Sequence, residues 1–438
     1  MTGAARVLVV GAGPAGLYAA TALAAAEVEV DVAERLPTPF GLVRYGVAPD
    51  HPKIKSVAGV LSRPFSSPGV RFLGNVEVGV DLTPADLARH YDAVVYATGA
   101  PVGRMAGIEG EDLPGSAPAG DFVSWYSGHP DAPDLSPLLA SRRVAVIGAG
   151  NVALDVVRLL VKDPASLAGT DLPDHVLAAL RASAVTDVHL VARRGPAQVR
   201  FTPAELRELG ELPGVDVLVA AEDVAGALAE AADGSRADRA NVDILCEWAR
   251  RAPGGRDRRV WLRFRRRPVR LLGPDRVSGL VVRGEREELL PVQGVLHAVG
   301  YGAVPLPGLP FDRDSGTVPH VAGRVVDPER GVLPGVYVAG WLKRGATGVI
   351  GTNKADAGET AASLLADLPG LRRAPDRDPG SVTALLSRRG VPVVTWEGWR
   401  RIEREEERLG ARQGRAVAKL ADLPAMLALA TRPGGPRG

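Results

Sequence analysis

The sequence is poor in cysteine, with Cys246 as the one thiol in 438 residues. One thiol cannot form an intrachain disulfide, a zinc cluster or a cysteine-ligated iron–sulfur centre. The seven histidines are scattered along the chain and show no pair at metal-ligand spacing, so we expect no metal site. Any redox chemistry of this chain must therefore use a bound cofactor.

Aromatic residues make up only 5% of the chain, and neither sign of charge prevails, because 53 Lys and Arg stand against 51 Asp and Glu. This balance gives no reason to expect nucleic-acid binding. The apolar share of 46% and the charged share of 24% fit a globular α/β protein. They exclude disordered, collagenous and coiled-coil classes, and the length allows two or three domains.

An uncharged run from Val7 to Ala26 is long enough to imitate a signal or transmembrane segment. Gly11, Gly13, Pro14 and Gly16 interrupt it, so neither interpretation is favoured. We expect a cytoplasmic protein that binds no membrane, and we expect a monomer.

Two parts of the chain show the pattern of a parallel α/β fold. Arg6 to Val10 predicts a buried strand, Leu17 to Ala26 a helix and Val28 to Ala33 a second strand, which is a βαβ unit. Arg143 to Ile147 and Val152 to Val161 predict a second strand and helix around another glycine turn. The chain therefore contains two candidate nucleotide-binding units.

The first glycine turn fits the GxGxxG fingerprint with Gly11, Gly13, Ala15 and Gly16. Such glycines allow a tight turn and a close backbone approach, so that N–H groups at a helix start hold a pyrophosphate. Glu34 ends the next predicted strand, where a carboxylate accepts hydrogen bonds from ribose hydroxyls and repels a 2′-phosphate. This unit suits FAD or NAD and disfavours NADP.

The second glycine turn carries alanine at its third conserved position. Its residues are Gly148, Gly150, Asn151, Val152 and Ala153. After the later predicted strand, Asp187 to Ala192, Arg193 and Arg194 stand where an NAD-binding unit would place an acid. Two guanidiniums bind a 2′-phosphate well, so NADP is expected here, with an ordinary surface arginine pair as the alternative.

Together the two units predict a flavoprotein in which NADPH reduces FAD. Because no CxxC pair exists, an internal disulfide cannot carry the electrons further. The electrons must leave the flavin for an external acceptor.

Five segments in chain order resemble one family closely. They are Phe40 to Lys55, Asn151 to Val156, Arg193 to Gln198, Phe201 to Leu209, and Gly340 to Thr352. They resemble the adrenodoxin reductase family of NADPH–ferredoxin reductases, including its bacterial members. The resemblance spans nearly the whole chain and is weakest after about Gly414.

The resemblance implies an α/β fold of two Rossmann-like dinucleotide-binding domains, with the NADP domain inserted into the FAD domain. It implies an FAD domain of residues 1–100 and 325–438, the latter with a C-terminal helical extension, and an NADP domain of residues 101–324. The implied activity is that of a ferredoxin–NADP⁺ reductase, which passes a hydride from NADPH to FAD and then single electrons to a ferredoxin.

The resemblance also assigns cofactor contacts. The FAD contacts it implies are Gly16, Glu34, Leu42, Val76, Trp341, Gly348, Val349 and Ile350. The NADP contacts it implies are Gly150, Asn151, Val152, Ala153, Arg193, Arg194 and Glu205, with Gly348 near the nicotinamide. A helix beginning near Asn353 would point its positive end at the flavin.

Proton transfer at a reduced flavin benefits from a nearby titratable group. The family pattern favours His51, with Asp155 and Glu208 as further candidates for proton relay or positioning. The alternatives are a hydrogen-bonded structural histidine, a packed or paired helix carboxylate, and a solvated helix face, respectively.

The span from Arg250 to Arg270 holds ten arginines against one acid, Asp257. It predicts either a docking patch for an acidic ferredoxin or arginines on the solvated side of a strand. Two other functions stay open: a flavin reductase of the glutamate-synthase small-subunit type, which usually carries cluster cysteines, and a non-enzymatic flavin-binding redox sensor.

Overall fold

Strand β1 (Arg6–Val10) is buried along its whole length, as a central strand of a parallel sheet must be. Val7 and Val9 pack into one hydrophobic cluster, while Leu8 and Val10 pack into another. The side chains of this strand thus point alternately to the two faces of one sheet.

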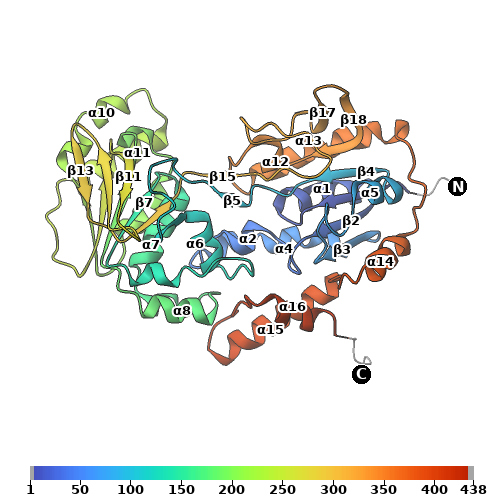
Figure 1. The fold of residues 1–438 in the computed structure, drawn as a ribbon, viewed down its shortest axis with the longest axis horizontal. Helices are drawn as coiled ribbons and strands as arrows, with labels where there is room; N and C mark the ends of the chain where they lie inside the picture. Colours follow the sequence, from blue (N-terminus) through green and yellow to red (C-terminus); the bar gives the residue numbers. More distant parts are fainter. Residues whose placement is uncertain (1–3, 433–438) are drawn as a thin grey trace. The chain divides into compact units, whose positions relative to one another are not determined.

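The computed structural model describes residues 4–432, which divide into two units (Figure 1). Of the described residues, unit 1 comprises 4–102 and 301–432, and unit 2 comprises 103–300. The short strands β5 (Val102–Gly103) and β15 (Tyr301–Gly302) pair where the chain passes from one unit to the other. Among the described residues, no helix combines the length and apolar character needed to cross a bilayer.

Unit 1 is built on a seven-stranded sheet of order β16-β17-β18-β4-β1-β2-β3. Its strands are β1, β2 (Glu29–Glu34), β3 (Val70–Gly74), β4 (Ala93–Tyr96), β16 (His320–Val321), β17 (Arg324–Asp327) and β18 (Gly331–Val338). The five strands from β18 to β3 are parallel, and β16 and β17 add an antiparallel edge.

The helices of unit 1 follow the strands and cover both faces of this sheet. They are α1 (Pro14–Ala24), α2 (Leu42–Tyr45), α3 (Pro52–Lys55), α4 (Ala58–Leu61), α5 (Pro84–His90), α12 (Trp341–Arg344), α13 (Thr352–Asp367), α14 (Pro379–Arg388), α15 (Trp396–Arg412) and α16 (Leu423–Ala430). In this sheet β2 lies on one side of β1 and β4 lies on the other side, so the strand order reverses at β1. Ligands of open α/β sheets bind at the carboxyl ends of strands at such a switch point.

Unit 2 contains a six-stranded parallel sheet of order β6-β14-β7-β8-β10-β9. Its strands are β6 (Ser116–Pro118), β7 (Arg143–Ile147), β8 (Asp187–Val191), β9 (Val215–Val219), β10 (Arg258–Arg263) and β14 (Gly294–His297). Its helices are α6 (Ala119–Tyr126), α7 (Asn151–Val161), α8 (Asp174–Arg181), α9 (Pro203–Gly210), α10 (Ala227–Glu230) and α11 (Arg236–Trp248).

The second face of the parallel sheet in unit 2 is covered by strands. An antiparallel sheet of β11 (Arg267–Leu272), β12 (Gly279–Arg283) and β13 (Glu287–Leu290) lies there. Ala145 and Ile147 of β7 share a hydrophobic cluster with Leu271 and Leu280 of this sheet. Val144 and Val146 face the helices instead.

The division of the chain differs from the expected one at the second boundary. The first change, after Val102, lies close to the expected residue 100. The chain returns to unit 1 at Tyr301, whereas the predicted NADP domain extends to residue 324. The physical reason is that Ala303, Leu306 and Phe311 pack against the core of unit 1.

Candidate functional site

The glycine turn between β1 and α1 has the shape that a pyrophosphate requires. A Cβ on Gly11 would lie 2.6 Å from the Ala97 carbonyl oxygen, and one on Gly16 would lie 2.0 Å from the Gly11 carbonyl oxygen. A Cβ on Gly13 would meet no atom within 4 Å. The first and third glycines are therefore required by close packing, whereas Gly13 borders open space at the start of α1. Ala15 is buried in that first turn.

Glu34, the last residue of β2, lies beside this turn. Its carboxylate accepts hydrogen bonds from the backbone N–H groups of Ala12 at 2.8 Å and Leu36 at 3.1 Å. Burial raises the pKa of Glu34, while these two hydrogen bonds act in the opposite direction. The carboxyl group thus stands at the carboxyl end of β2, where ribose hydroxyls are bound in this fold.

The segment before α2 lies directly against the glycine turn. Phe40 donates its N–H to the Ala12 carbonyl oxygen at 2.8 Å, and a Cβ on Gly41 would lie 3.1 Å from the Gly13 Cα. The next residue, Leu42, is 37% exposed, although the residues that follow it in α2 are buried. Leu42 therefore lies beside the open space at Gly13.

Val76 is connected to this region through its backbone. The whole residue is 1% exposed and belongs to the core, and its N–H donates to the Glu34 carbonyl oxygen at 2.9 Å. Val76 therefore lies beside the end of β2, with little of its surface open.

The segment from Gly340 to Ile350 approaches the same turn from the C-terminal part of unit 1. A Cβ on Gly340 would lie 2.6 Å from the Ala15 Cβ, in the first turn of α1. Trp341 donates its indole N–H to the Thr347 carbonyl oxygen at 2.9 Å, which closes the loop that directly precedes Gly348. Val349 is 70% exposed, and α13 begins two residues after Ile350, close to the expected start.

The second glycine turn, in unit 2, has the same pattern of close packing and open space as the first. A Cβ on Gly148 would lie 2.3 Å from the Ala298 carbonyl oxygen, whereas a Cβ on Gly150 would meet nothing within 4 Å. Ala153 is fully buried, which confirms that the third position packs the helix against the sheet. Val152 is half-buried, and the side chain of Asn151 accepts a hydrogen bond from the Thr202 N–H at 2.9 Å.

Arg193 and Arg194 follow β8 at the carboxyl end of the same sheet and are both exposed. Because β8 pairs in parallel with β7, the ends of both strands meet at one edge. The guanidiniums are therefore available to a ligand that starts at the Gly148 turn.

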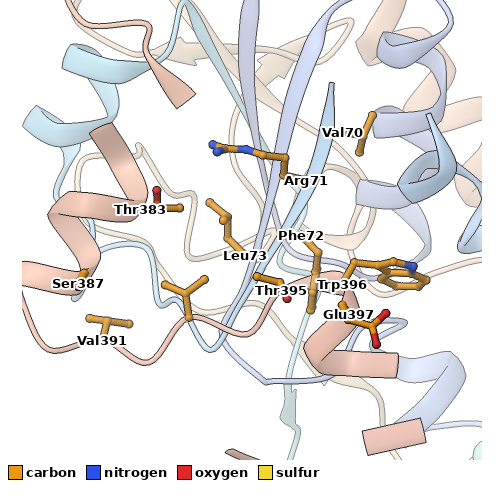
Figure 2. A pocket seen from close by; sticks show the side chains of 11 residues that line it. Val70, Arg71, Phe72, Leu73, Thr383, Ser387, Val391, Thr395, Trp396 and Glu397 are labelled. Carbon is orange, nitrogen blue, oxygen red and sulfur yellow. The ribbon is translucent and has the colours of Figure 1, made fainter. Parts of the chain in front are cut away.

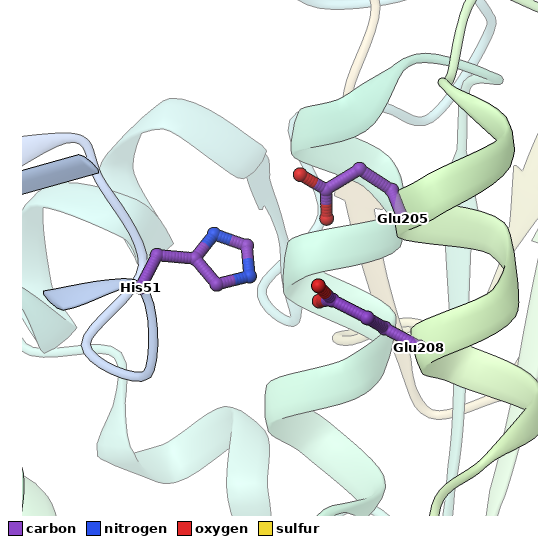
Figure 3. A group of neighbouring side chains, drawn as sticks. All are labelled: His51, Glu205 and Glu208. Atoms are coloured by element: carbon purple, nitrogen blue, oxygen red, sulfur yellow. The ribbon is translucent and has the colours of Figure 1, made fainter. Parts of the chain in front are cut away.

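A buried arginine, Arg158, gathers three carboxylates within unit 2. Its Nη2 donates to Asp155 at 2.8 Å, and its Nη1 donates to Glu205 at 3.2 Å and Glu208 at 3.3 Å. The Arg158 side chain is 3% exposed, whereas that of Glu208 is 49% exposed. Figure 3 shows Glu205 and Glu208 projecting from α9, one helical turn apart. His51, also drawn there, belongs to unit 1 and immediately precedes α3.

Two residues near the glycine turns, one in each unit, were not predicted from the sequence. Arg158 stands three positions after Asp155 on α7, a spacing that signals an ion pair, but nothing in the sequence indicates that it also meets α9. Asp356 accepts a hydrogen bond from the Gly340 N–H at 2.5 Å and pairs with the Lys343 ammonium at 3.2 Å. It fixes the bend at Gly340, and no motif marked it.

The arginine-rich span of unit 2 is largely ion-paired with acids of other segments. The pairs are Arg259 with Asp187 at 2.8 Å, Arg263 with Glu288 at 3.0 Å, Arg265 with Glu230 at 2.7 Å, Arg266 with Asp223 at 3.2 Å, and Arg270 with Glu287 at 3.8 Å. Much of its positive charge is therefore neutralised locally. This weakens the interpretation of the span as a docking patch.

A cavity of about 680 Å³ in unit 1 lies away from these residues. It is bordered by β3, α14 and the start of α15, with Phe72, Leu73 and Trp396 among its mainly apolar lining (Figure 2). The one guanidinium that borders it, Arg71, donates to Asp31 through two hydrogen bonds of 2.7 Å. None of the predicted site residues lines this cavity.

Residues 5–211 match the family of pyridine nucleotide-disulphide oxidoreductases. NADPH-ferredoxin reductase FprA of Mycobacterium tuberculosis is 43% identical, over 96% of this chain and 98% of that protein. The mitochondrial NADPH:adrenodoxin oxidoreductase of Homo sapiens is 39% identical, over 97% of this chain and 91% of that protein. The structure of Mycobacterium tuberculosis FprA in complex with NADPH matches with a TM-score of 0.92 and 41% identity, over 98% of this chain and all of that one.

Fold, glycine turns and comparisons define an oxidoreductase with an FAD domain and an inserted NADP domain, whose cofactors are FAD and NADP(H). Both glycine turns fit such cofactors, because each leaves its middle glycine facing open space. More particularly, the chain belongs to the adrenodoxin reductase-like family of NADPH–ferredoxin reductases.

Proposed function

We propose that this protein is an NADPH–ferredoxin reductase whose electron acceptor is an iron–sulfur ferredoxin. The bound flavin would supply the chemistry that links hydride transfer from NADPH to single-electron transfer to the iron–sulfur protein. The observation that carries the proposal is the pair of open glycine turns, one followed by a carboxylate at Glu34 and the other by Arg193 and Arg194. The relatives named as ferredoxin and adrenodoxin reductases support the acceptor.

We assign FAD to unit 1 and NADP(H) to unit 2. The FAD contacts are Gly11, Gly13, Ala15, Gly16, Glu34, Leu42, Val76, Trp341, Gly348, Val349 and Ile350. The NADP(H) contacts are Gly148, Gly150, Asn151, Val152, Ala153, Arg193, Arg194 and Glu205. The exposed side chains of Leu42 and Val349 support the first set, because both are open to a ligand.

For proton handling and positioning we propose His51, Asp155 and Glu208. Hydrogen bonds from Arg158 hold both Asp155 and Glu208, which favours a positioning role for these carboxylates over a free relay. We further propose that the protein acts as a cytoplasmic monomer and binds neither nucleic acid nor membranes.

The decisive experiment combines two measurements on the purified yellow protein. NADPH is added without oxygen while flavin absorbance is followed, and cytochrome c reduction is measured with and without ferredoxin. Rapid bleaching with strong stimulation by ferredoxin is the expected result. Fast bleaching without stimulation would contradict the acceptor alone, and absence of bleaching would contradict the reductase.

The NADP assignment has its own test, the double variant Arg193→Ala with Arg194→Ala. We expect its KM for NADPH to rise by at least about 10- to 100-fold while its KM for NADH changes little, because even one lost charged hydrogen bond, worth about 1.5–3 kcal/mol, has an effect of this size. Arg181→Ala, at the exposed end of α8, is the matched control and should leave both values unchanged. An unaltered preference for NADPH in the double variant would show that the 2′-phosphate binds elsewhere.

A further inference from the structure

Helix α15 and the segment that follows it bind Arg44, a residue close to the proposed flavin site. Arg44 of α2 is 8% exposed, and its two terminal nitrogens donate to both carboxylate oxygens of Glu406, at 3.0 and 2.5 Å. Glu406 belongs to α15 and is 1% exposed. The desolvated pair forms a two-point contact with fixed geometry.

A second charged residue of the extension reaches the backbone of Arg44. The Lys419 ammonium, itself 7% exposed, donates to the Arg44 carbonyl oxygen at 2.7 Å. Lys419 is tied to the first contact, because the next residue, Leu420, donates its N–H to Glu406 at 2.8 Å. Side chain and main chain of Arg44 are thus held by one assembly between α15 and α16.

Aromatic rings of α15 also contact residues on both sides of Gly41. The guanidinium of Arg44 lies 5.1 Å from the Trp399 ring centroid, within reach of a cation–π contact. The ring of Phe40 meets Trp399 edge-on at 6.0 Å and Trp396 at 6.4 Å. The extension therefore fixes the residues that flank Gly41 and Leu42.

The flanked segment needs such support, because its backbone is strained. Phe40 has φ +82°, which a bulky L-residue rarely adopts, and Gly41 has φ +49°. A conformation of this kind persists only where surrounding contacts determine it. It brings Gly41 against Gly13 and leaves Leu42 exposed beside the first glycine turn.

We propose that Glu406 and Lys419 are positioning residues that hold Phe40 to Arg44 in the conformation that binds FAD. Helices α15 and α16, with the segment between them, then determine how tightly the flavin is retained. This inference rests on the proposed contact between Leu42 and FAD.

The test uses the full-length holoprotein with Glu406→Gln, which keeps the shape of the side chain and removes its charge. FAD release is followed by the recovery of flavin fluorescence, at a temperature where circular dichroism shows that the apoprotein stays folded. We expect the Kd for FAD to rise about tenfold, a typical size for coupling between a ligand site and a distant group. The Kd for NADP⁺ should stay unchanged.

Glu405→Gln is the matched control, because Glu405 sits next to Glu406 on α15 but pairs with Arg408 at the surface, at 2.7 Å. It should bind FAD as the wild type does. Lys419→Met provides a second arm if Glu406→Gln does not fold, and it should weaken FAD binding in the same direction. Wild-type FAD binding in the folded positioning variants would overturn the proposal, even if their melting temperatures fall.

Gly41→Ala separates this inference from the assignment on which it rests. A Cβ there is strained at φ +49° and points at Gly13, so FAD binding should be lost. Retained FAD binding in Gly41→Ala would refute the assigned flavin contact. Loss in Gly41→Ala with wild-type binding in Glu406→Gln and Lys419→Met would refute the positioning role alone.

Discussion

Arg158 shows how one buried cation organises acids that the sequence presents as separate candidates. It contributes one positive charge to three carboxylates, of which Asp155 and Glu205 are mostly buried. Removing this cation takes away a charge that offsets the repulsion between the buried carboxylates. The role of Asp155 and Glu208 is therefore inseparable from Arg158.

We predict that Arg158→Met lowers the free energy of unfolding by about 2–4 kcal/mol at neutral pH, as expected when a buried charge loses its partner. Denaturant titration of the variant and the wild type measures this loss. Glu208→Gln is the control, with an expected loss below about 1 kcal/mol because that side chain is half-exposed. A loss for Arg158→Met that is no larger than that for Glu208→Gln would contradict this account.

Among the elements, the strand pair β8 and β10 carries a buried titratable group. His189 of β8 stacks on Trp261 of β10 with 6.2 Å between ring centroids, and its Nδ1 accepts a hydrogen bond from Arg263 at 3.1 Å. Burial, followed by the charge of Arg263, lowers the pKa of His189 to about 4. The strand pair therefore requires a neutral imidazole.

This requirement predicts a stability loss in acid. Above the ordinary pKa of about 6.5 the imidazole is neutral in both states and costs nothing. Between about pH 6.5 and 4 only the unfolded chain takes up the proton, so stability falls, by up to about 3 kcal/mol in total. Subtracting the unfolding curve of His189→Phe from that of the wild type isolates this term from the carboxylates. A difference that is flat across this window would show that His189 is not desolvated.

The elements around the glycine turns were predictable because buried parallel strands form short apolar runs. Strands β1 and β7 coincide with the predicted ranges Arg6 to Val10 and Arg143 to Ile147. Helix α1 begins at Pro14, earlier than the predicted Leu17, because proline suits the first helical turn. The sheet that covers β7 was not predicted: β11 begins at the end of the arginine-rich span, and β12 and β13 follow after it.

The glycines and acids that follow a strand were also predictable, since their spacing reflects local geometry. Contacts across the chain were not. Arg44 and Glu406 are 362 residues apart, and Arg158 reaches Glu205 from another helix. Only the folded chain shows such partners, so the sequence named the candidate carboxylates but not the cations that hold them.

At the scale of the whole molecule, each large cluster of buried hydrophobic residues belongs to one unit only. Two large clusters, which include Leu17 and Leu82, lie entirely within unit 1. The clusters that include Leu154 and Leu280 lie entirely within unit 2. Each unit therefore has its own core, as independently folding domains do.

We predict that calorimetry of the holoprotein resolves two unfolding transitions with different ligand responses. NADP⁺ at about 100 times its Kd should stabilise the transition of unit 2 by about 2.7 kcal/mol, because it binds only the folded form. Removal of FAD should lower the transition of unit 1 instead. NAD⁺ at the same concentration is the control and should shift neither transition, since it lacks the 2′-phosphate that Arg193 and Arg194 would bind. One transition that both cofactors shift equally would show that the two cores unfold together.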